Sequence, residues 1–442
     1  MEWSQGLVFM FRKVLIGVAA VAIGCCIQGI PEVPDVDSHS YLLLAEGRIN
    51  EVVAPYASRV LHPAAARWVR EAVNFYSGAG ESSFGLEQAF CCVAGLALLT
   101  AFWALFTLNR SLAGPTALAL VVSPLLCLYT VNIYLQDLFA LALLAVFLVL
   151  LQAKRFFYAL AVLFLLHLTR ESAYVVTVVL VVVSLVRRQW LLAVGACLAA
   201  AGAAGVLSVV TRHALPNIHA MNGFVYLATK VFANGLANVS GVTVWSDSYA
   251  RLLPHYYPDP PLWKVPVASW LPLGRITEIG IYGIDCGRPV ELLKRLLSTF
   301  GVMPLVAFLG RRAFLGRRAL DLPLAEAVAG ASGLLFLLLS PFCGRSIERI
   351  VGYAWPLFWF VVPAIWAERT GRAEAAPSSG RWLWGAHLAC MWWPALMARA
   401  GLGGAAEDAL ALAGIGACYW SAWRWGVRQR SATGLTEERA GT

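Results

Sequence analysis

Charged residues are scarce in this chain of 442 residues. Only 13% of its residues are Asp, Glu, Lys or Arg, 60% are hydrophobic, and the mean hydropathy is +0.69. A soluble domain carries about 25% charged residues, so this composition excludes an ordinary soluble protein and predicts a polytopic membrane protein. The net charge of +9 does not predict nucleic-acid binding, because the basic residues form short clusters between apolar runs, as orientation determinants do.

Two sequence signals are missing. The first apolar segment, residues 14 to 27, follows Arg12 and Lys13 but has no small-residue cleavage site after it, so we expect a retained anchor rather than a removed signal peptide. The ten cysteines show no metal-ligand spacing, and most lie in apolar stretches, where a thiol behaves as a small hydrophobe. Cys286 and Cys343 fall in expected outer loops, where an oxidising compartment would permit a disulfide, although spacing alone does not establish its geometry.

Internal repeats and low-complexity linkers are also missing. A single membrane domain, residues 1 to 430, with a short polar and disordered cytoplasmic tail, residues 431 to 442, therefore accounts for the chain. Hydropathy predicts about 12 transmembrane helices, each near the length that crosses ~30 Å of hydrocarbon. The expected spans are 9 to 30, 89 to 108, 112 to 132, 137 to 152, 156 to 169, 172 to 186, 190 to 210, 296 to 310, 322 to 340, 350 to 367, 382 to 399 and 408 to 423.

Basic clusters predict how these helices are oriented. With the amino terminus in the cytoplasm, every cluster falls on the cytoplasmic side, as the positive-inside rule expects. The clusters are Arg12 with Lys13, Arg110, Lys154 with Arg155, Arg187 with Arg188, Arg311 to Arg318, Arg369 to Arg381, and Arg424 to Arg430. Both termini are then cytoplasmic, and two long outer loops span residues 31 to 88 and 211 to 295.

Long loops usually carry function or structure of their own. In the first outer loop, Tyr41 to Ala45 and Val60 to Val69 have apolar residues at helical spacing, which predicts short helices along the membrane surface. In the second, Tyr and Trp residues between Tyr249 and Trp270 alternate with prolines, which predicts an irregular aromatic lid. These aromatic residues could stack on sugars, but an interfacial aromatic belt is the more common reason for such a cluster.

Ionisable residues gather at four places on the expected outer face. Desolvating a charge is unfavourable, and functional sites are the usual exception. The groups are Asp35 and Asp37 with His39, after the first span; Asp137, where the fourth span begins; Arg170 and Glu171, between two short spans; and Arg345, Glu348 and Arg349, before the tenth span.

Each group also has a structural explanation. The aspartates of the first loop could solvate a helix end, and Asp137 could cap its helix. Arg170 and Glu171 could neutralise each other in a turn, and Glu348 could do the same for its neighbouring arginines. A carboxylate near a low-dielectric wall, however, is suited to be a general base, and arginine is suited to bind phosphate through two hydrogen bonds.

This arrangement resembles the polytopic bacterial glycosyltransferases of the GT-C superfamily. The resemblance rests on the Asp-bearing loop after the first span, the outer Asp137, the Arg170-Glu171 turn, and Glu348-Arg349 before a span that contains Pro356. A second likeness is to a run seen in uncharacterised relatives of these enzymes: Tyr41, Ala45, Gly47, Pro55, Tyr56, Arg59, Leu61 and Pro63. The acidic residue that often precedes the late arginine is spaced differently here.

The resemblance implies an all-α, GT-C-like bundle in the bacterial cytoplasmic membrane. It implies an inverting transfer of a sugar from a polyprenyl-phosphate donor to a glycan, lipid or protein acceptor on the outer face, in cell-envelope polysaccharide biosynthesis. Either Asp37 or Asp35 would be the general base, with Asp37 favoured because His39 and Tyr41 follow it at alternating positions. Asp137 would orient the acceptor or a metal ion.

The other residues receive roles in binding. Arg170, Arg345 and Arg349 would bind the donor phosphate, while the remaining substrate-binding candidates are His39, Tyr41, Arg59, His62, Glu171 and Glu348. A divalent cation, Mg²⁺ or Mn²⁺, would have Asp35, Asp37 and Asp137 as its candidate ligands. One rival is a transporter or flippase of a lipid-linked glycan, which the absence of repeated halves disfavours. Another is a noncatalytic subunit of a surface-polysaccharide assembly system.

Overall fold

The protein is described from a computed structural model. It describes residues 2–28, 36–52, 56–77, 84–110, 112, 114–215, 223–246, 262–266, 278–309, 322–343, 347–365, 377–401 and 404–440. These residues are mostly helical, as the sequence predicts.

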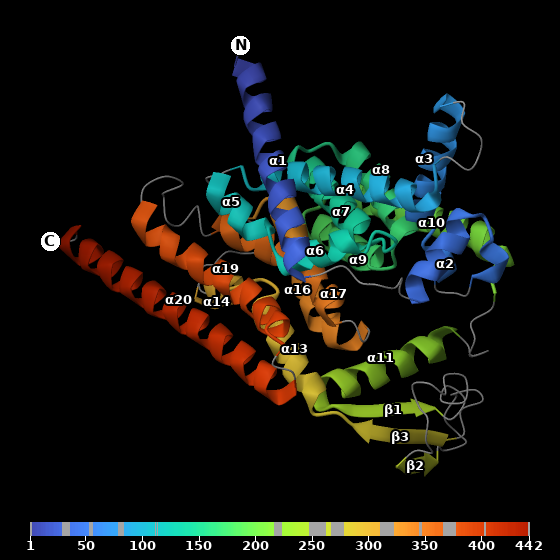
Figure 1. The fold of residues 1–442 in the computed structure, drawn as a ribbon. Coiled ribbons are helices and arrows are strands. Elements are labelled where there is room, and N and C mark those ends of the chain that lie inside the picture. Colours follow the sequence, from blue (N-terminus) through green and yellow to red (C-terminus); the bar gives the residue numbers. More distant parts are fainter. Residues whose placement is uncertain are drawn as a thin grey trace.

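The first half of the chain is a series of helices joined mainly by short turns (Figure 1). After the first outer loop, α4 packs against α7, α7 packs against α8, and α10 packs against α8 and α9. Their bounds are α1 (Glu2–Gln28), α4 (Leu86–Leu108), α5 (Gly114–Val121), α6 (Pro124–Val131), α7 (Asp137–Gln152), α8 (Phe156–Thr169), α9 (Ala173–Val186) and α10 (Trp190–Val210).

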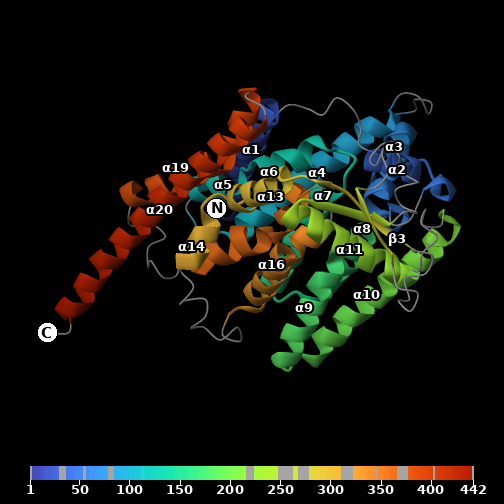
Figure 2. The ribbon, with the colours of Figure 1, turned by 90° about the horizontal axis from the view of Figure 1, so that it is seen from below.

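The second half of the chain adds helices, some of which pack against α6 and α7. Figure 2 shows α19 and α20 side by side at one end of the molecule. The elements are α13 (Gly287–Ser298), α14 (Met303–Leu309), α16 (Leu324–Cys343), α17 (Ile347–Val351), the 3-10 turn η4 (Gly352–Ala354), the π-helical η5 (Pro356–Val361), α19 (Pro377–Arg399) and α20 (Gly404–Ala440).

Helical structure lies over each of the expected spans, but the spans are not all single helices. Pro124 has no N–H to continue a helix, so the third span is divided between α5 and α6. At Gly301, whose φ is +54°, α13 and α14 meet at an angle of 72°. The hydroxyl of Tyr419 donates to the carbonyls of Leu297 and Gly301, at 3.1 and 3.2 Å, which satisfies backbone groups freed by this bend.

Three described helices are long and apolar enough to cross a membrane, namely α4, α10 with the turn that follows it, and α16. The bent pair α13 and α14 would be a fourth if it forms one span. These helices are consistent with membrane association. The other apolar helices, such as α7, α8 and α9, are shorter than one crossing, so the expected number of about 12 membrane spans stays a prediction.

The first outer loop contains the two helices that were expected there. They are α2 (Val36–Ala45) and α3 (Leu61–Ser77), with the 3-10 turns η1 (Ile49–Glu51) and η2 (Tyr56–Ser58) between them. The backbone N–H of Leu215, in the second loop, donates to the carbonyl of Val52, in the first, at 3.0 Å. The two segments that the sequence assigns to the outer face are therefore neighbours.

The second outer loop corrects the expectation of an all-α fold. It holds η3 (Thr211–His213) and α11 (Gly223–Ser240), followed by a three-stranded antiparallel sheet in the order β1 (Val242–Ser246), β3 (Glu278–Ile284), β2 (Trp263–Pro266). The strands are rich in Val, Ile, Trp and Tyr, which favour a pleated surface. The sequence prediction gave more weight to the prolines between Pro254 and Pro261, which lie outside the described residues.

The carboxyl terminus gives a second correction. The expected disordered tail, residues 431 to 442, is helical up to Ala440 because α20 continues through it. Glu437, Glu438, Arg439 and Ala440 are all good helix formers, so the end of this tail extends an existing helix at little cost.

Candidate active site

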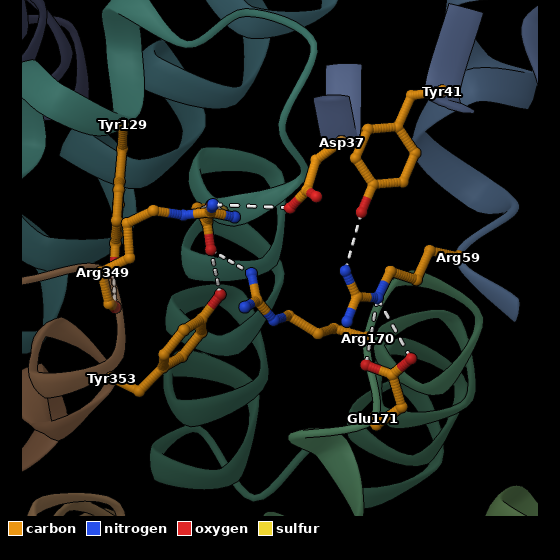
Figure 3. Close-up of polar contacts among 9 residues, drawn as sticks. Asp37, Tyr41, Arg59, Tyr129, Arg170, Glu171, Arg349 and Tyr353 are labelled. Carbon is orange, nitrogen blue, oxygen red and sulfur yellow. Dashed lines mark hydrogen bonds and ion pairs between the residues drawn. The ribbon is translucent and has the colours of Figure 1, made fainter. Parts of the chain in front are cut away.

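Six charged side chains from distant parts of the chain meet where the first outer loop covers the helix bundle (Figure 3). We call this group the charged layer. Its members are Asp37 of α2, Arg59 just after η2, Asp137 at the start of α7, Arg170 and Glu171 in the turn between α8 and α9, and Arg349 of α17. Three are carboxylates and three are guanidinium groups, so the layer is neutral when all are ionised.

Asp137 is the centre of the layer and is almost fully buried, with 1% of its side chain exposed. Its Oδ1 accepts hydrogen bonds from Nη1 of Arg170 and the hydroxyl of Tyr353. Its Oδ2 accepts from Nε and Nη2 of Arg349, at 2.9 and 2.8 Å. Four donors therefore surround one carboxylate, which orients two arginines and has little capacity to accept a further proton.

Local structure explains why these three residues meet. Asp137 is the first residue of α7, where the helix dipole favours a negative charge. Arg170 has an extended backbone, with φ −161° and ψ 147°, because α8 ends at Thr169 and the chain turns towards α9. Arg349 lies on the short helix α17, and its backbone carbonyl accepts a hydrogen bond of 2.7 Å from the hydroxyl of Tyr129.

Glu171 is the centre of a second set of contacts in the layer. Nε of Arg59 donates to both carboxylate oxygens of Glu171 at 3.1 Å, and Oγ of Ser58 donates to one of them at 3.0 Å. Nη1 of Arg59 also donates to the hydroxyl of Tyr41, at 2.7 Å. Desolvation favours the neutral acid, but Arg59 outweighs it, so the pKa of Glu171 is lower than usual. This pair fixes the first outer loop to the α8–α9 turn.

Asp37 is the more accessible of the two described aspartates in the layer, with 23% of its side chain exposed. Its Oδ2 lies 3.7 Å from Nη1 of Arg349, which is an ion pair but longer than a hydrogen bond. Burial and the neighbouring Asp37, to which the Tyr56 hydroxyl is hydrogen-bonded, raise the pKa of Tyr56. In contrast with Asp137, Asp37 keeps carboxylate lone pairs that a substrate proton could reach.

Each arginine binds a carboxylate with only some of the N–H groups of its guanidinium. Among the residues that the structure describes, Nη2 of Arg59 and Nη2 of Arg170 make no hydrogen bond, and Nη1 of Arg349 has only the long contact with Asp37. The Arg170 guanidinium also lies 4.6 Å from the centre of the Tyr353 ring, a cation–π contact that restrains it. Unused N–H groups on restrained arginines can bind an anion such as a phosphate.

The two histidines of the predicted site differ in position. His62 is 2% exposed and packs against Phe90 and Phe139, and burial lowers its pKa to about 4, so it is neutral at pH 7. It supports α3 on the bundle rather than facing outward. His39 is exposed on α2 and makes no described contact with the charged layer.

Three predicted residues cannot be placed in the layer. Asp35 and Arg345 lie outside the described residues, and the side chain of Glu348 is not described. Sequence reasoning, in turn, missed the three tyrosines at positions 56, 129 and 353 as site residues. Tyr353 follows Arg349 by one helical turn, which is a signal that could have been used, whereas Tyr129 has no distinguishing signal within an apolar span.

Asp137, one of the three candidate ligands of the expected metal ion, makes contacts that do not suit a divalent cation. Both oxygens of Asp137 already accept hydrogen bonds from cationic or hydroxyl groups, and a divalent cation would have to displace two arginines. Within the described part of the chain, no three His, Cys, Asp or Glu side chains are grouped to hold a metal. The two cysteines considered for a disulfide, Cys286 and Cys343, are both free thiols.

Comparisons with protein-family models, with curated proteins and with solved structures gave no match to this chain.

Proposed function

We propose that this protein is an inverting membrane glycosyltransferase that uses a polyprenyl-phosphate sugar. The acceptor is a glycan, lipid or protein at the outer face of the bacterial cytoplasmic membrane, and the product belongs to a cell-envelope polysaccharide or glycoconjugate. One observation carries the proposal: Asp37 and Arg349, which are far apart in the sequence, lie side by side above Asp137 and Arg170.

Asp37 has the role of general base. It takes the proton of an acceptor hydroxyl while the oxygen of that hydroxyl forms a bond to the anomeric carbon of the donor sugar. The bond from the anomeric carbon to the phosphate oxygen breaks, and the bonding electrons leave with the phosphate. Attack from the face opposite the phosphate inverts the configuration.

The arginines stabilise the negative charge that develops on the departing phosphate. Arg349 and Arg170 are held in place before the substrate arrives, since Asp137 binds both, and such preorganised donors lower the barrier of a charge-separating step. Asp137 is thus a positioning residue in this mechanism. In this mechanism the arginines stabilise the phosphate, and the contacts of Asp137 commit its carboxylate to them.

The base assignment is tested by Asp37→Asn in membranes supplied with labelled polyprenyl-phosphate sugar. The amide keeps the shape of the carboxylate but cannot take a proton, so we expect transfer to fall by about 10²- to 10⁴-fold, the usual contribution of a general base. Protein level and thermal stability should stay close to those of the unmodified protein, because the ion pair of Asp37 with Arg349 is long and an asparagine can still accept the hydrogen bond of the Tyr56 hydroxyl.

Two variants complete this experiment. Asp35→Asn asks whether the neighbouring aspartate is the base instead. Asp285→Asn is the matched control, because Asp285 is an exposed aspartate of the second outer loop whose Oδ1 accepts from the N–H of Gly287 at 2.9 Å and whose Oδ2 lies 3.8 Å from Nε of Arg288, an ion pair about as long as that of Asp37. Full transfer activity in both Asp37→Asn and Asp35→Asn, at equal expression, would exclude the proposed base. Intact surface polysaccharide in cells carrying both changes would favour a noncatalytic subunit.

A further inference from the structure

The helix of the second outer loop, α11, packs on the outer end of α16 through two buried asparagines. Asn234 is 3% exposed and Asn238 is 0% exposed, and they lie one turn apart on the same face. Nδ2 of Asn238 donates to the carbonyl of Pro341 at 2.7 Å, and Nδ2 of Asn234 approaches the carbonyl of Phe342 at 3.5 Å. A side chain at Gly235 would collide with the Phe342 ring, so glycine permits this close approach.

The carbonyls that receive these bonds need partners from outside their helix. Pro341 and Phe342 are in the last turn of α16, which ends at Cys343, and the last four carbonyls of a helix have no N–H partner within it. A polar side chain that is fully buried in an apolar seam is normally there to satisfy such a group. The two amides therefore supply donors to two of the last four carbonyls of α16.

Asn238 also contacts a third element. Its Oδ1 accepts a hydrogen bond of 3.4 Å from Nη1 of Arg288, in the first turn of α13. One amide thus joins α11, α13 and the end of α16, using both its donor and its acceptor. Beyond α16 the next described helix is α17, which carries Arg349 and packs against α13. The elements that Asn238 joins are the ones that flank α17.

We propose that Asn238 is a positioning residue for Arg349. Through its bonds to Pro341 and Arg288, Asn238 fixes α16 relative to α13, the two helices that pack against α17, and so sets the place of the Arg349 guanidinium above Asp137. The consequence for phosphate binding rests on the proposed function, and the structural consequence does not. In this arrangement the affinity for the lipid-linked donor depends on a loop whose described residues are not members of the charged layer.

The test compares Asn238→Asp with Asn74→Asp. Aspartate has the shape of asparagine but, when ionised, has no N–H to donate. Asn74 is a matched control, since its Nδ2 also donates to a backbone carbonyl, that of Phe84, at 3.3 Å, in the first outer loop. Two quantities are measured: amide hydrogen exchange of peptides that cover residues 341 to 352, and the kinetic constants of sugar transfer.

For Asn238→Asp we expect exchange in those peptides to become several-fold faster, because the end of α16 opens locally more often. The KM for the polyprenyl-phosphate sugar should rise about tenfold, which corresponds to the loss of one good hydrogen bond, while kcat changes less than about twofold. Asn74→Asp should leave both quantities unchanged. If Asn238→Asp does not fold, Asn234→Asp tests the same seam through its weaker bond.

The outcomes separate this proposal from the proposed function. Unchanged hydrogen exchange in both Asn238→Asp and Asn234→Asp would overturn the role of Asn238 at the end of α16. Faster exchange with an unchanged donor KM would overturn the positioning of Arg349. If the unmodified protein transfers no sugar, the glycosyltransferase proposal fails, and the exchange measurement still decides whether α11 holds the end of α16.

Discussion

The charged layer has a counterpart elsewhere in the molecule, and the two differ in how they bury their cations. At the contact of α13 with α20, Nζ of Lys294 lies 2.5 Å from Glu291 and 2.7 Å from Asp408, and Nε of Arg295 lies 2.6 Å from Glu291. We call these four residues the α13–α20 cluster. Lys294 is slightly more buried than Arg349, with 8% of its side chain exposed against 11%.

The difference lies in what each group leaves unused. Three of the four residues of the α13–α20 cluster lie within about one turn of the same helix. Its two carboxylates are 28 and 31% exposed, so water can replace a lost partner. In the charged layer the partners come from separate elements, and Asp137 is buried. The arginines there also have N–H groups that make no hydrogen bond to any residue that the structure describes. The α13–α20 cluster thus has the features of a structural link between two helices, whereas the charged layer has the features of a binding site.

The largest contrast is expected for Asp137→Asn against Asp408→Asn. The amide at position 137 would present N–H groups to two buried guanidiniums, and removing one partner of a buried ion pair costs about 3–5 kcal/mol. Asn at position 408 can still accept from Lys294, which keeps Glu291, so we expect a loss of about 1 kcal/mol. Thermal unfolding in detergent measures both. Equal losses would contradict the distinction between the two groups.

A charge-conserving exchange sharpens the comparison further. Arg349→Lys keeps the positive charge but cannot bind Asp137 and a phosphate with separate N–H edges. We expect transfer to fall by about tenfold or more, the equivalent of one lost hydrogen bond to a charged group. The reciprocal change, Lys294→Arg, should leave transfer within about twofold and shift stability by less than about 1.5 kcal/mol. Transfer measured in the same membranes checks both, and a loss caused by Lys294→Arg would link that cluster to activity.

The residues that the sequence singled out were visible for a simple physical reason. Charged side chains at helix ends stand out in an apolar chain, and the structure brings Asp37, Asp137, Arg170 and Arg349 together. Their pairing was not predictable, because Arg59 and Glu171 are 112 positions apart and meet only after the outer loop folds on the bundle.

The fold, too, was predictable only in part. Helices over the expected spans follow from hydropathy alone, whereas the sheet of the second outer loop was missed. Its strands are short, and β1 and β3 are separated by 31 residues that include several prolines, so their pairing is a long-range event. The breaks at Pro124 and Gly301 were likewise hidden, since an apolar run reads as one span until its packing is known.

The smallest expected effect concerns pH and the contact between Glu171 and Arg59. The pKa of Glu171 is lowered in the folded protein, so this pair stabilises the fold above the ordinary pKa of glutamate, and the contribution is lost as pH falls through the lowered value. The Glu171 side chain is 42% exposed, and solvent screening limits the contribution to less than about 1 kcal/mol.

Melting temperatures of the unmodified protein and Glu171→Gln, compared at pH 7 and pH 4, measure this contribution. We expect a gap of a few degrees or less at pH 7 that narrows at pH 4, because pH 4 is below the ordinary pKa of glutamate and the unfolded chain then binds the proton more readily than the folded protein does. Glu46→Gln, which removes the exposed carboxylate 3.0 Å from Arg48 in the same loop, is the control and should show a smaller gap at pH 7. A gap for Glu171→Gln that widens on acidification would contradict the lowered pKa, and with it the contact that fixes the first outer loop beside Asp37.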